Sequence, residues 1–403
     1  MAKQNTKTST HQTRNSASRP LRRKPTLDFS VTGLIYCTMM MFIGLAAINT
    51  QVNPLFGVFG LMIGILIVSF LISGFVIRRL TVDRVFPDYF MVGVSAFIQY
   101  HITNRKRFWP SLSVSVSELD AQMFTRQPTA YMLHCANKNT AVIPAEVVPF
   151  RRGVFNLDRY QLSTSFPFGF IKRAIDGRQK DPLVVLPPVG KMHRELLRQF
   201  RSAESQGDNV RPSRGGADEF YGVKPYRAGE NPRTIYWKRS ARTGSLVVKE
   251  MTRVSPPKVL VLVDAFAAAM PVEKYAAVER AIAMAATLID QAMEVGLPVG
   301  LVAWSGEWIS VPPGRGKRHR LDLLTHLAKL PRNDQHNHAA LIDRARPLSQ
   351  SDTTAVLVTS ENVSLTRSPG MRGGMIALAS SGQQGNRYFT FPDHIDFATG
   401  YEP

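Results

Sequence analysis

The chain has 403 residues, of which 44% are hydrophobic and 20% are charged, and it carries a formal net charge of +20. This length predicts more than one domain, and the composition excludes a wholly disordered protein. Its 2 cysteines are too few for a disulfide framework and fit a reducing compartment. The basic residues are scattered and do not alternate with aromatic residues along a stripe, so nucleic-acid binding is not expected.

The N-terminal part begins with a polar tail. Residues 1–30 are rich in Ser, Thr, Gln, Asn, Lys and Arg, a composition that cannot bury a core, and they predict a disordered basic tail. Two segments without any charged residue follow, at residues 31–48 and 55–77. At about 1.5 Å of rise per residue, the second is long enough for a hydrocarbon core of about 30 Å, and the first is at the lower limit.

These two segments predict a transmembrane hairpin over residues 31–79. A buried core helix would have an amphipathic face, and a cleaved signal peptide would have a small-residue site before the polar turn. Neither feature is present. Lys and Arg flank both outer ends of the hairpin, whereas the loop has none. The positive-inside rule therefore predicts that the N-terminus and everything after about residue 80 are cytoplasmic.

Residues 80–190 contain short strand-like runs separated by turn residues, at 97–102, 112–117, 131–135 and 145–150. Apolar and polar residues alternate in the second run, as they do in a strand with one buried face. We predict a β-sandwich-like domain. Its isolated histidines, His101 and His134, are interpreted as ordinary strand residues, and we find no set of catalytic groups in this region.

Residues 191–257, which we call the signature arm, contain an ordered pattern of aromatic and charged residues. The pattern consists of Glu219, Phe220, Tyr226, Gly229, Glu230, Arg233, Ile235, Trp237, Lys238, Ala241 and Arg242. It resembles the signature of the bacterial domain-of-unknown-function 58 family. Lys224 and Glu230 stand where that family has Arg and Asp, so both positions keep their charge.

Two interpretations of the signature arm remain open. The favoured one is an internal network of ion pairs and cation–π contacts that docks the arm onto the next domain. The other is an arginine-lined contact surface for a partner or a phosphate-bearing ligand, formed by cations of this segment, namely Lys224, Arg227, Arg233, Lys238, Arg239 and Arg242.

Residues 258–403 alternate buried strands with helices. Continuous apolar runs at 258–263, 298–303 and 354–359 are typical of parallel strands, and residues 273–295 and 321–330 have helical spacing. Residues 374–379 and 387–391 are candidates for final strands. The order predicts a doubly wound, Rossmann-type α/β domain.

The family resemblance implies that this α/β domain is von Willebrand factor A-like. Such domains often bind a divalent ion through Asp-x-Ser-x-Ser after the first strand. Here Asp264 is followed by Phe266 and Ala268 in place of the two serines, so we expect no metal site and interpret Asp264 as a cap of the next turn. His336 and His338 have no evident third ligand, which argues against zinc.

The sequence therefore predicts a multi-domain protein of the bacterial inner (plasma) membrane with no catalytic residues and no cofactor. The family resemblance implies a partner among the MoxR-type AAA+ ATPases. We interpret the chain as a membrane-anchored, non-enzymatic cytoplasmic adaptor or scaffold. The alternative is an envelope-associated enzyme or phosphate-ligand-binding protein that uses the basic signature arm.

Overall fold

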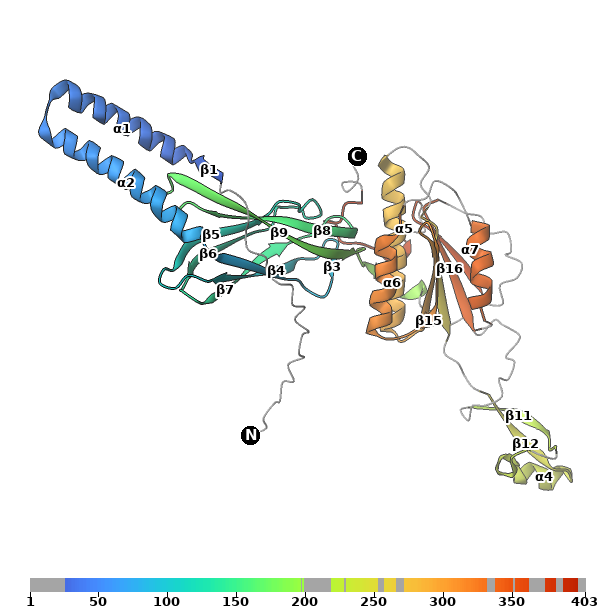
Figure 1. Cartoon of the computed structure of the whole chain (residues 1–403). Helices are drawn as coiled ribbons and strands as arrows, with labels where there is room; N and C mark the ends of the chain where they lie inside the picture. Colours follow the sequence, from blue (N-terminus) through green and yellow to red (C-terminus); the bar gives the residue numbers. More distant parts are fainter. Residues whose placement is uncertain are drawn as a thin grey trace. The chain divides into compact units, whose positions relative to one another are not determined.

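A computed structural model describes residues 26–196, 198, 219–227, 230–252, 257–265, 272–331, 338–350, 352–361, 374–381 and 387–397. The chain forms two compact units, Met1–Val185 and Leu186–Pro403 (Figure 1). Most of the predicted tail lies outside the described residues. Thr26–Phe29, however, forms strand β1, because these residues pair with the first residues of β9. The disordered tail was therefore predicted too long at its C-terminal end.

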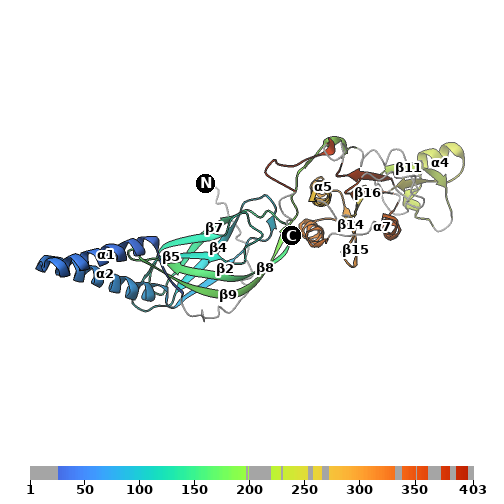
Figure 2. The same cartoon turned by 90° about the horizontal axis from the view of Figure 1, so that it is seen from above.

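Two apolar helices follow β1, namely α1 (Val31–Thr50) and α2 (Asn53–Ile77), as the sequence predicts. They lie side by side in both views of the structure (Figures 1 and 2). Gln51 ends α1 in a left-handed conformation, and Pro54 occupies the first turn of α2, where its missing N–H costs nothing. Both helices are long and apolar enough to cross a membrane. Their many exposed apolar side chains suggest membrane insertion.

The rest of the first unit, residues 80–185, consists of two antiparallel sheets, and we call it the β unit. The larger sheet has the order β1-β9-β8-β5-β6, with β3 also paired to β9, and the smaller one has the order β2-β4-β7. Their bounds are β2 Leu80–Val85, β3 Phe90–Met91, β4 Ala96–Asn104, β5 Ser111–Glu118, β6 Thr129–Cys135, β7 Thr140–Val147, β8 Gly153–Thr164 and β9 Ile171–Leu186.

The two sheets share one apolar core. Tyr100 and Ile98 from β4 are completely buried together with Val116 from β5 and Leu162 from β8. The alternation predicted at residues 112–117 is realised, because Val114 and Val116 point into this core while the residues between them are partly exposed. His101 and His134 lie in β4 and β6.

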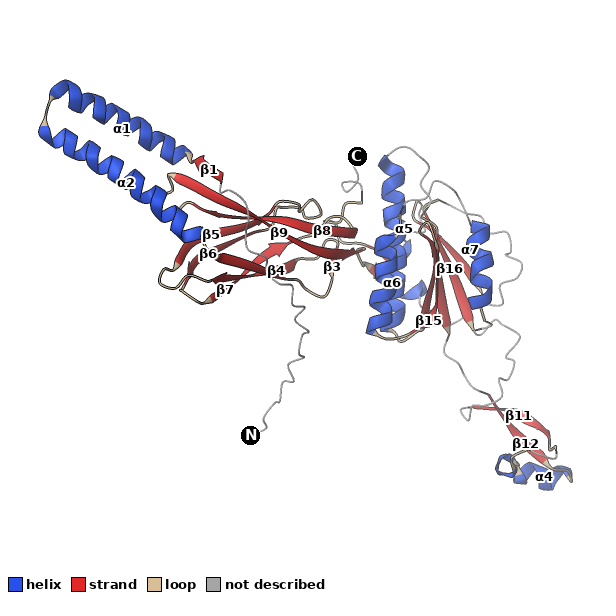
Figure 3. Ribbon diagram, viewed as in Figure 1, coloured by secondary structure: helices blue, strands red, loops and turns tan. Residues whose placement is uncertain are grey.

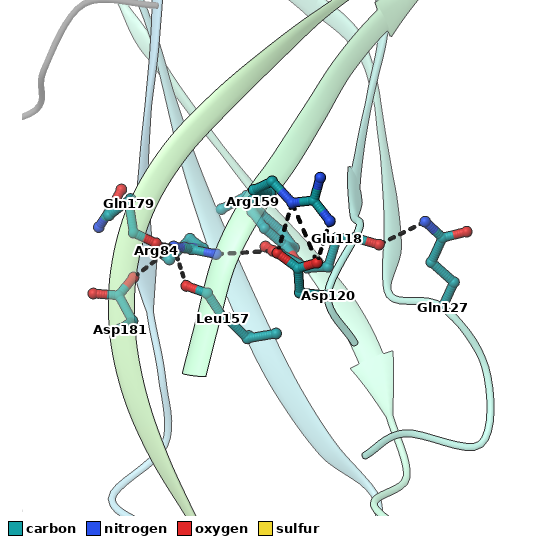
Figure 4. A network of polar contacts seen from close by, with 9 residues as sticks. Arg84, Glu118, Asp120, Gln127, Leu157, Arg159, Gln179 and Asp181 are labelled. Carbon is teal, nitrogen blue, oxygen red and sulfur yellow. Dashed lines mark hydrogen bonds and ion pairs between the residues drawn. The ribbon is translucent and has the colours of Figure 1, made fainter. Parts of the chain in front are cut away.

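A buried ion pair crosses this core from one sheet to the other (Figure 4). Nη1 of Arg84, on β2, donates to Oε2 of Glu118, on β5, over 2.8 Å, and both side chains are fully buried. Nη2 of Arg84 lies 2.9 Å from Oδ2 of Asp181 on β9. The same guanidinium donates to the carbonyl groups of Leu157 and Gln179.

Glu118 has a second side-chain donor, since the Tyr100 hydroxyl lies 3.0 Å from its Oε1. Burial raises the pKa of the Glu118 carboxyl, while Arg84 and the Tyr100 hydroxyl act in the opposite direction. Burial also raises the pKa of Tyr100, so that its hydroxyl stays a donor. Arg84 and Glu118, the two fully buried charges, therefore both have hydrogen-bond partners, as buried ions require.

The second unit contains a mixed five-stranded sheet in the order β15-β14-β13-β16-β17. All of its strands are parallel except the edge strand β15. Helices α5 and α6 cover one face and α7 the other (Figure 3). The bounds are β13 Lys258–Val263, α5 Val272–Glu294, β14 Val299–Trp304, β15 Trp308–Gly314, α6 Lys317–Lys329, α7 His338–Ala345, η2 Arg346–Leu348, β16 Thr353–Thr359 and β17 Met375–Ala379.

The predicted strands and helices of this sheet are present, with three differences. Helix α7 was not predicted. β15 was not predicted, because Pro312 and Pro313 read against a strand; an edge strand tolerates them, since its outer N–H groups need no partner. The last expected strand, at residues 387–391, does not join the sheet. Its residues Phe389–Thr390 form β18 and pair instead with β10 (Lys191–Met192).

We predict that Arg84→Met destabilises the β unit by about 3–5 kcal/mol, because Glu118 would remain buried without its cation. The measurement is amide hydrogen exchange of β5 and β8 in the purified full chain. Arg84→Met/Glu118→Leu should recover much of the loss, since both charges are then removed.

The matched control is Arg159→Met, which removes another arginine of the same region (Figure 4). Arg159 pairs with Asp120 over 2.7 Å, but the two side chains are 47% and 30% exposed. Its replacement should leave the exchange rates nearly unchanged, because solvent screens an exposed pair. Equal effects of the two single replacements would contradict the central role of Arg84.

Candidate functional site

The described part of the signature arm is a two-stranded sheet with a helix between its strands. β11 (Glu219–Pro225) and β12 (Val247–Thr252) pair antiparallel, with a bulge between Phe220 and Gly222. A 3₁₀ turn, η1 (Pro232–Thr234), and a short helix, α4 (Trp237–Thr243), lie between them along the chain (Figure 1).

Local side chains fix this connection. The Asn231 side chain accepts a hydrogen bond from the backbone N–H of Arg233 and begins η1. Oγ of Ser240 accepts from the backbone N–H of Val247 over 2.9 Å and thereby holds α4 against β12. Gly244 ends α4 with a φ of 68°, a conformation that glycine adopts without strain.

Part of the charge of the signature arm is used internally. Nζ of Lys224 lies 2.6 Å from Oε1 of Glu230, and both side chains are partly buried. These are the two positions at which the chain departs from the family signature, and they are each other's partners. Lys249 lies over the Tyr236 ring at 4.8 Å from its centre. One ion pair and one cation–π contact therefore lie within the described part of the arm.

Four cations of η1 and α4, near Trp237 in the sequence, face solvent. Arg233 from η1 and Lys238, Arg239 and Arg242 from α4 are all exposed, and Trp237 is 65% exposed. Lys238 and Arg242 are four residues apart and share one face of the helix. Within the described residues, none of these four cations lies in an ion pair with a carboxylate. We call these five residues the exposed cluster.

The structure thus divides the predicted site residues. It leaves Arg233, Trp237, Lys238 and Arg242 exposed in η1 and α4, and it places Tyr226 and Glu230 in internal contacts of the arm. Glu219 and Phe220 begin β11 opposite Thr252 and Met251, but their side chains are outside the description. Gly229 lies outside the described residues. Asn231 and Ser240 position the cluster and were not predicted; the Asn-Pro pair at 231–232 is the signal that could have indicated a turn.

The carboxyl edge of the five-stranded sheet is the second place where polar groups meet. Asp264 follows β13, is 3% exposed, and its Oδ2 lies 2.8 Å from Nδ1 of His338 at the start of α7. Phe266 and Ala268, and the turn that Asp264 was expected to cap, lie outside the described residues. Among those described, no three His, Cys, Asp or Glu side chains gather as metal ligands would. Asp264 instead faces an imidazole.

Comparison with known proteins identifies a family. Residues 222–366 match the family described as "Protein of unknown function DUF58". No curated protein sequence matches the chain. A solved structure, the GH20 exo beta-N-acetylglucosaminidase from Vibrio harveyi in complex with N-acetylglucosamine, is 10% identical and covers 70% of this chain, which spans 57% of that one. Its TM-score of 0.16 is too low to carry any argument.

We predict that millimolar magnesium leaves the amide exchange of β13 and β16 unchanged, because Asp264 has an imidazole partner and lacks the hydroxyl ligands that magnesium needs. His338→Ala should destabilise this edge by about 1–3 kcal/mol, since a buried carboxylate loses an imidazole contact. His326→Ala is the control: that imidazole lies 3.8 Å from the exposed Asp322, and its loss should have no effect. Protection that rises with magnesium would identify a metal site after all.

Proposed function

The chain belongs to the DUF58 family of proteins of unknown function, and on that basis we propose that it is a membrane-anchored, non-enzymatic adaptor whose signature arm binds a partner protein. The observation that carries this proposal is the exposed cluster. Tryptophan and arginine are the residues that contribute most binding energy at protein interfaces. Here a 65% exposed Trp237 stands among cations that have no acidic partner within the described chain.

The membrane part of the proposal rests on α1 and α2. We propose that both cross the bacterial inner membrane, with the N-terminus and everything after α2 in the cytoplasm. The connection between them, Gln51–Val52, has no positive charge, whereas Arg78 and Arg79 follow α2 directly. Positive charge concentrated at the outer ends of a hairpin favours this orientation.

The finer fold assignments belong to the same proposal. Two antiparallel sheets around one core support a β-sandwich-like domain for residues 80–190. A doubly wound sheet with helices on both faces supports a von Willebrand A-like domain for residues 258–403. Such a sheet can serve as a rigid scaffold next to a binding arm, which suits an adaptor.

We propose a MoxR-type AAA+ ATPase as the partner, as the family resemblance implies. A cationic and aromatic cluster would select an acidic surface with an apolar pocket on that ATPase or its client. Charge complementarity of this kind raises the association rate and falls with salt.

A second candidate function follows from the same cations. Arginine groups without acidic partners can hold a phosphate, which would fit a phosphate-ligand-binding protein or an envelope-associated enzyme. The exposed cluster contains no carboxylate, histidine, cysteine or serine that could act on such a ligand. Binding without catalysis is therefore the only form of this alternative that the cluster supports.

We predict that Arg233→Ala/Trp237→Ala/Arg242→Ala abolishes capture of a MoxR-type ATPase by the full chain from detergent-solubilised membranes, measured by mass spectrometry. The wild-type chain should capture it, and less of it at high salt. The control is Arg315→Ala/Arg318→Ala, which removes two other exposed arginines, before and in α6, and should leave capture unchanged.

The same experiment separates the alternatives. Capture that persists in the triple variant would contradict the assignment of the exposed cluster as the contact surface. Capture that inorganic phosphate competes away at constant ionic strength would favour the phosphate-binding alternative. Trp237→Phe alone should weaken capture less than Trp237→Ala, because phenylalanine keeps an aromatic face.

A further inference from the structure

The end of the β unit next to α1 and α2 has its own pattern of exposed residues. α2 ends at Ile77 and β2 begins at Leu80, so that only Arg78 and Arg79 separate them. Because this connection is short, the first residues of β2 lie immediately beyond the end of α2, at whatever depth α2 ends in a membrane. At about 1.5 Å per residue, the last turn of α2 lies within a few ångströms of the lipid headgroups if α2 spans the bilayer.

The loop between β4 and β5 is fastened to this last turn. Nζ of Lys106 donates to the carbonyl groups of Phe75 over 3.0 Å and Val76 over 2.7 Å, and the backbone N–H of Arg105 donates to the carbonyl of Arg79. Oγ of Ser111 also binds the Val76 carbonyl. These carbonyls belong to the helix end, where they have no partner within the helix and attract a cation. Burial lowers the pKa of Lys106 to about 8.

The fastened loop turns its other side chains outward. Phe108 is 75% exposed and Trp109 is 66% exposed, although both neighbour the buried Lys106. The amide of Asn104 donates to the Trp109 carbonyl over 3.1 Å, and Arg107 lies over the Phe108 ring at 5.1 Å. Two large aromatic side chains are thus held in solvent by a well-bonded backbone, at the level of the last turn of α2.

Helix α1 also begins at this end of the β unit, and hydrogen-bond and aromatic contacts hold its first residues there. The N–H of Ser30 donates to the Phe170 carbonyl, and Phe170 stacks on Tyr36 of α1 at 4.2 Å between ring centres. Phe29 is 64% exposed and Phe168 is 49% exposed. Both ends of the hairpin are therefore accompanied by exposed aromatic residues, and α1 and α2 emerge together from this end (Figure 1).

Positive charge surrounds these aromatic residues. Arg78 and Arg79 follow α2, Arg105 and Arg107 lie in the loop, and Lys172 and Arg173 begin β9. Arg173 lies over the Phe70 ring of α2 at 5.1 Å. Asp28 lies opposite Lys172 in the β1–β9 register and is an acidic residue at this end. Isolated exposed aromatic residues are ordinary, but aromatic residues among cations at the ends of two apolar helices match the composition of a membrane interface.

We propose that this end of the β unit is a lipid-binding surface, in which Phe108 and Trp109 enter the interfacial layer of the bilayer and Arg105 and Arg107 bind anionic phospholipid headgroups. The proposal rests on the membrane anchoring proposed above and adds the lipid class. Aromatic rings prefer the headgroup level, and each basic residue near an anionic surface contributes about 1 kcal/mol. The lipid surface would thereby add a further attachment of the β unit to the membrane, beside α1 and α2.

The test is tryptophan quenching in the full chain reconstituted into bilayers of phosphatidylcholine and phosphatidylglycerol with bromine near the headgroup. Wild-type fluorescence should be partly quenched, and Trp109→Phe should remove most of that quenching. Trp237→Phe, which removes a tryptophan of equal exposure, should leave it in place. Unchanged quenching in Trp109→Phe would overturn the proposal.

Two further variants make the outcome specific. Phe42→Trp places a tryptophan inside α1: if bromine in the middle of the acyl chains does not quench it, the membrane anchoring itself fails. If it is quenched and Trp109 is not, only the lipid-binding surface fails.

With brominated phosphatidylglycerol diluted in phosphatidylcholine, Arg105→Gln/Arg107→Gln should raise the half-quenching lipid fraction by about fivefold per charge. The control variant Arg315→Gln/Arg318→Gln should leave the half-quenching lipid fraction unchanged. An equal rise of that fraction in both double variants would refute the headgroup contact.

Discussion

The β unit depends on one buried cation. Arg84 lies on the first strand after α2 and binds Glu118 and Asp181 on two strands of the opposite sheet. Its guanidinium also uses two backbone carbonyls, so that one side chain joins β2, β5, β8 and β9. An ion pair of this kind costs desolvation and adds little net stability over an apolar core, but it accepts only one arrangement of the strands. The strand that continues the second apolar helix is thus tied to the larger sheet by side-chain contacts.

The chain uses its positive charge in three physically different ways. In the core of the β unit, Arg84 pairs with Glu118 and Asp181 and serves structure. At the end of α2, Lys106 binds backbone carbonyls and holds the loop that carries Trp109. In the signature arm, Arg233 and Arg242 remain exposed and without carboxylate partners in the described chain, and charge in that state is available to another molecule. The net charge of +20 is therefore no guide to a single kind of ligand.

Local periodicity explains what could be predicted from the sequence. The two apolar helices, the alternating strand β5 and the parallel strands β13, β14 and β16 all have patterns contained within one element. Contacts between distant elements could not be predicted in this way. The Arg84–Glu118 pair spans 34 residues of sequence, and the approach of His338 to Asp264 depends on where α7 packs. Strand β15 was not predicted because its prolines argue against a strand inside a sheet. They are compatible with an edge strand, but the sequence alone does not show that β15 lies at the edge.

The signature arm shows why a family pattern indicates a site only in part. The family match begins at residue 222, within β11, and extends to residue 366, after β16, so it includes the signature arm from Gly222 onward and most of the five-stranded sheet. Within the arm, Lys224 stands where the pattern has Arg, and Glu230 stands where it has Asp. The two side chains pair with each other, so the Glu side chain, which is longer than that of Asp, compensates for the shorter hydrogen-bonding reach of Lys compared with Arg. Such a paired change preserves a turn and implies a structural role. Arg233, Trp237, Lys238 and Arg242 match the pattern and have exposed side chains in the described part of the arm. Residues that a family pattern specifies and that the structure leaves exposed are the basis of the proposal that the arm contacts another molecule.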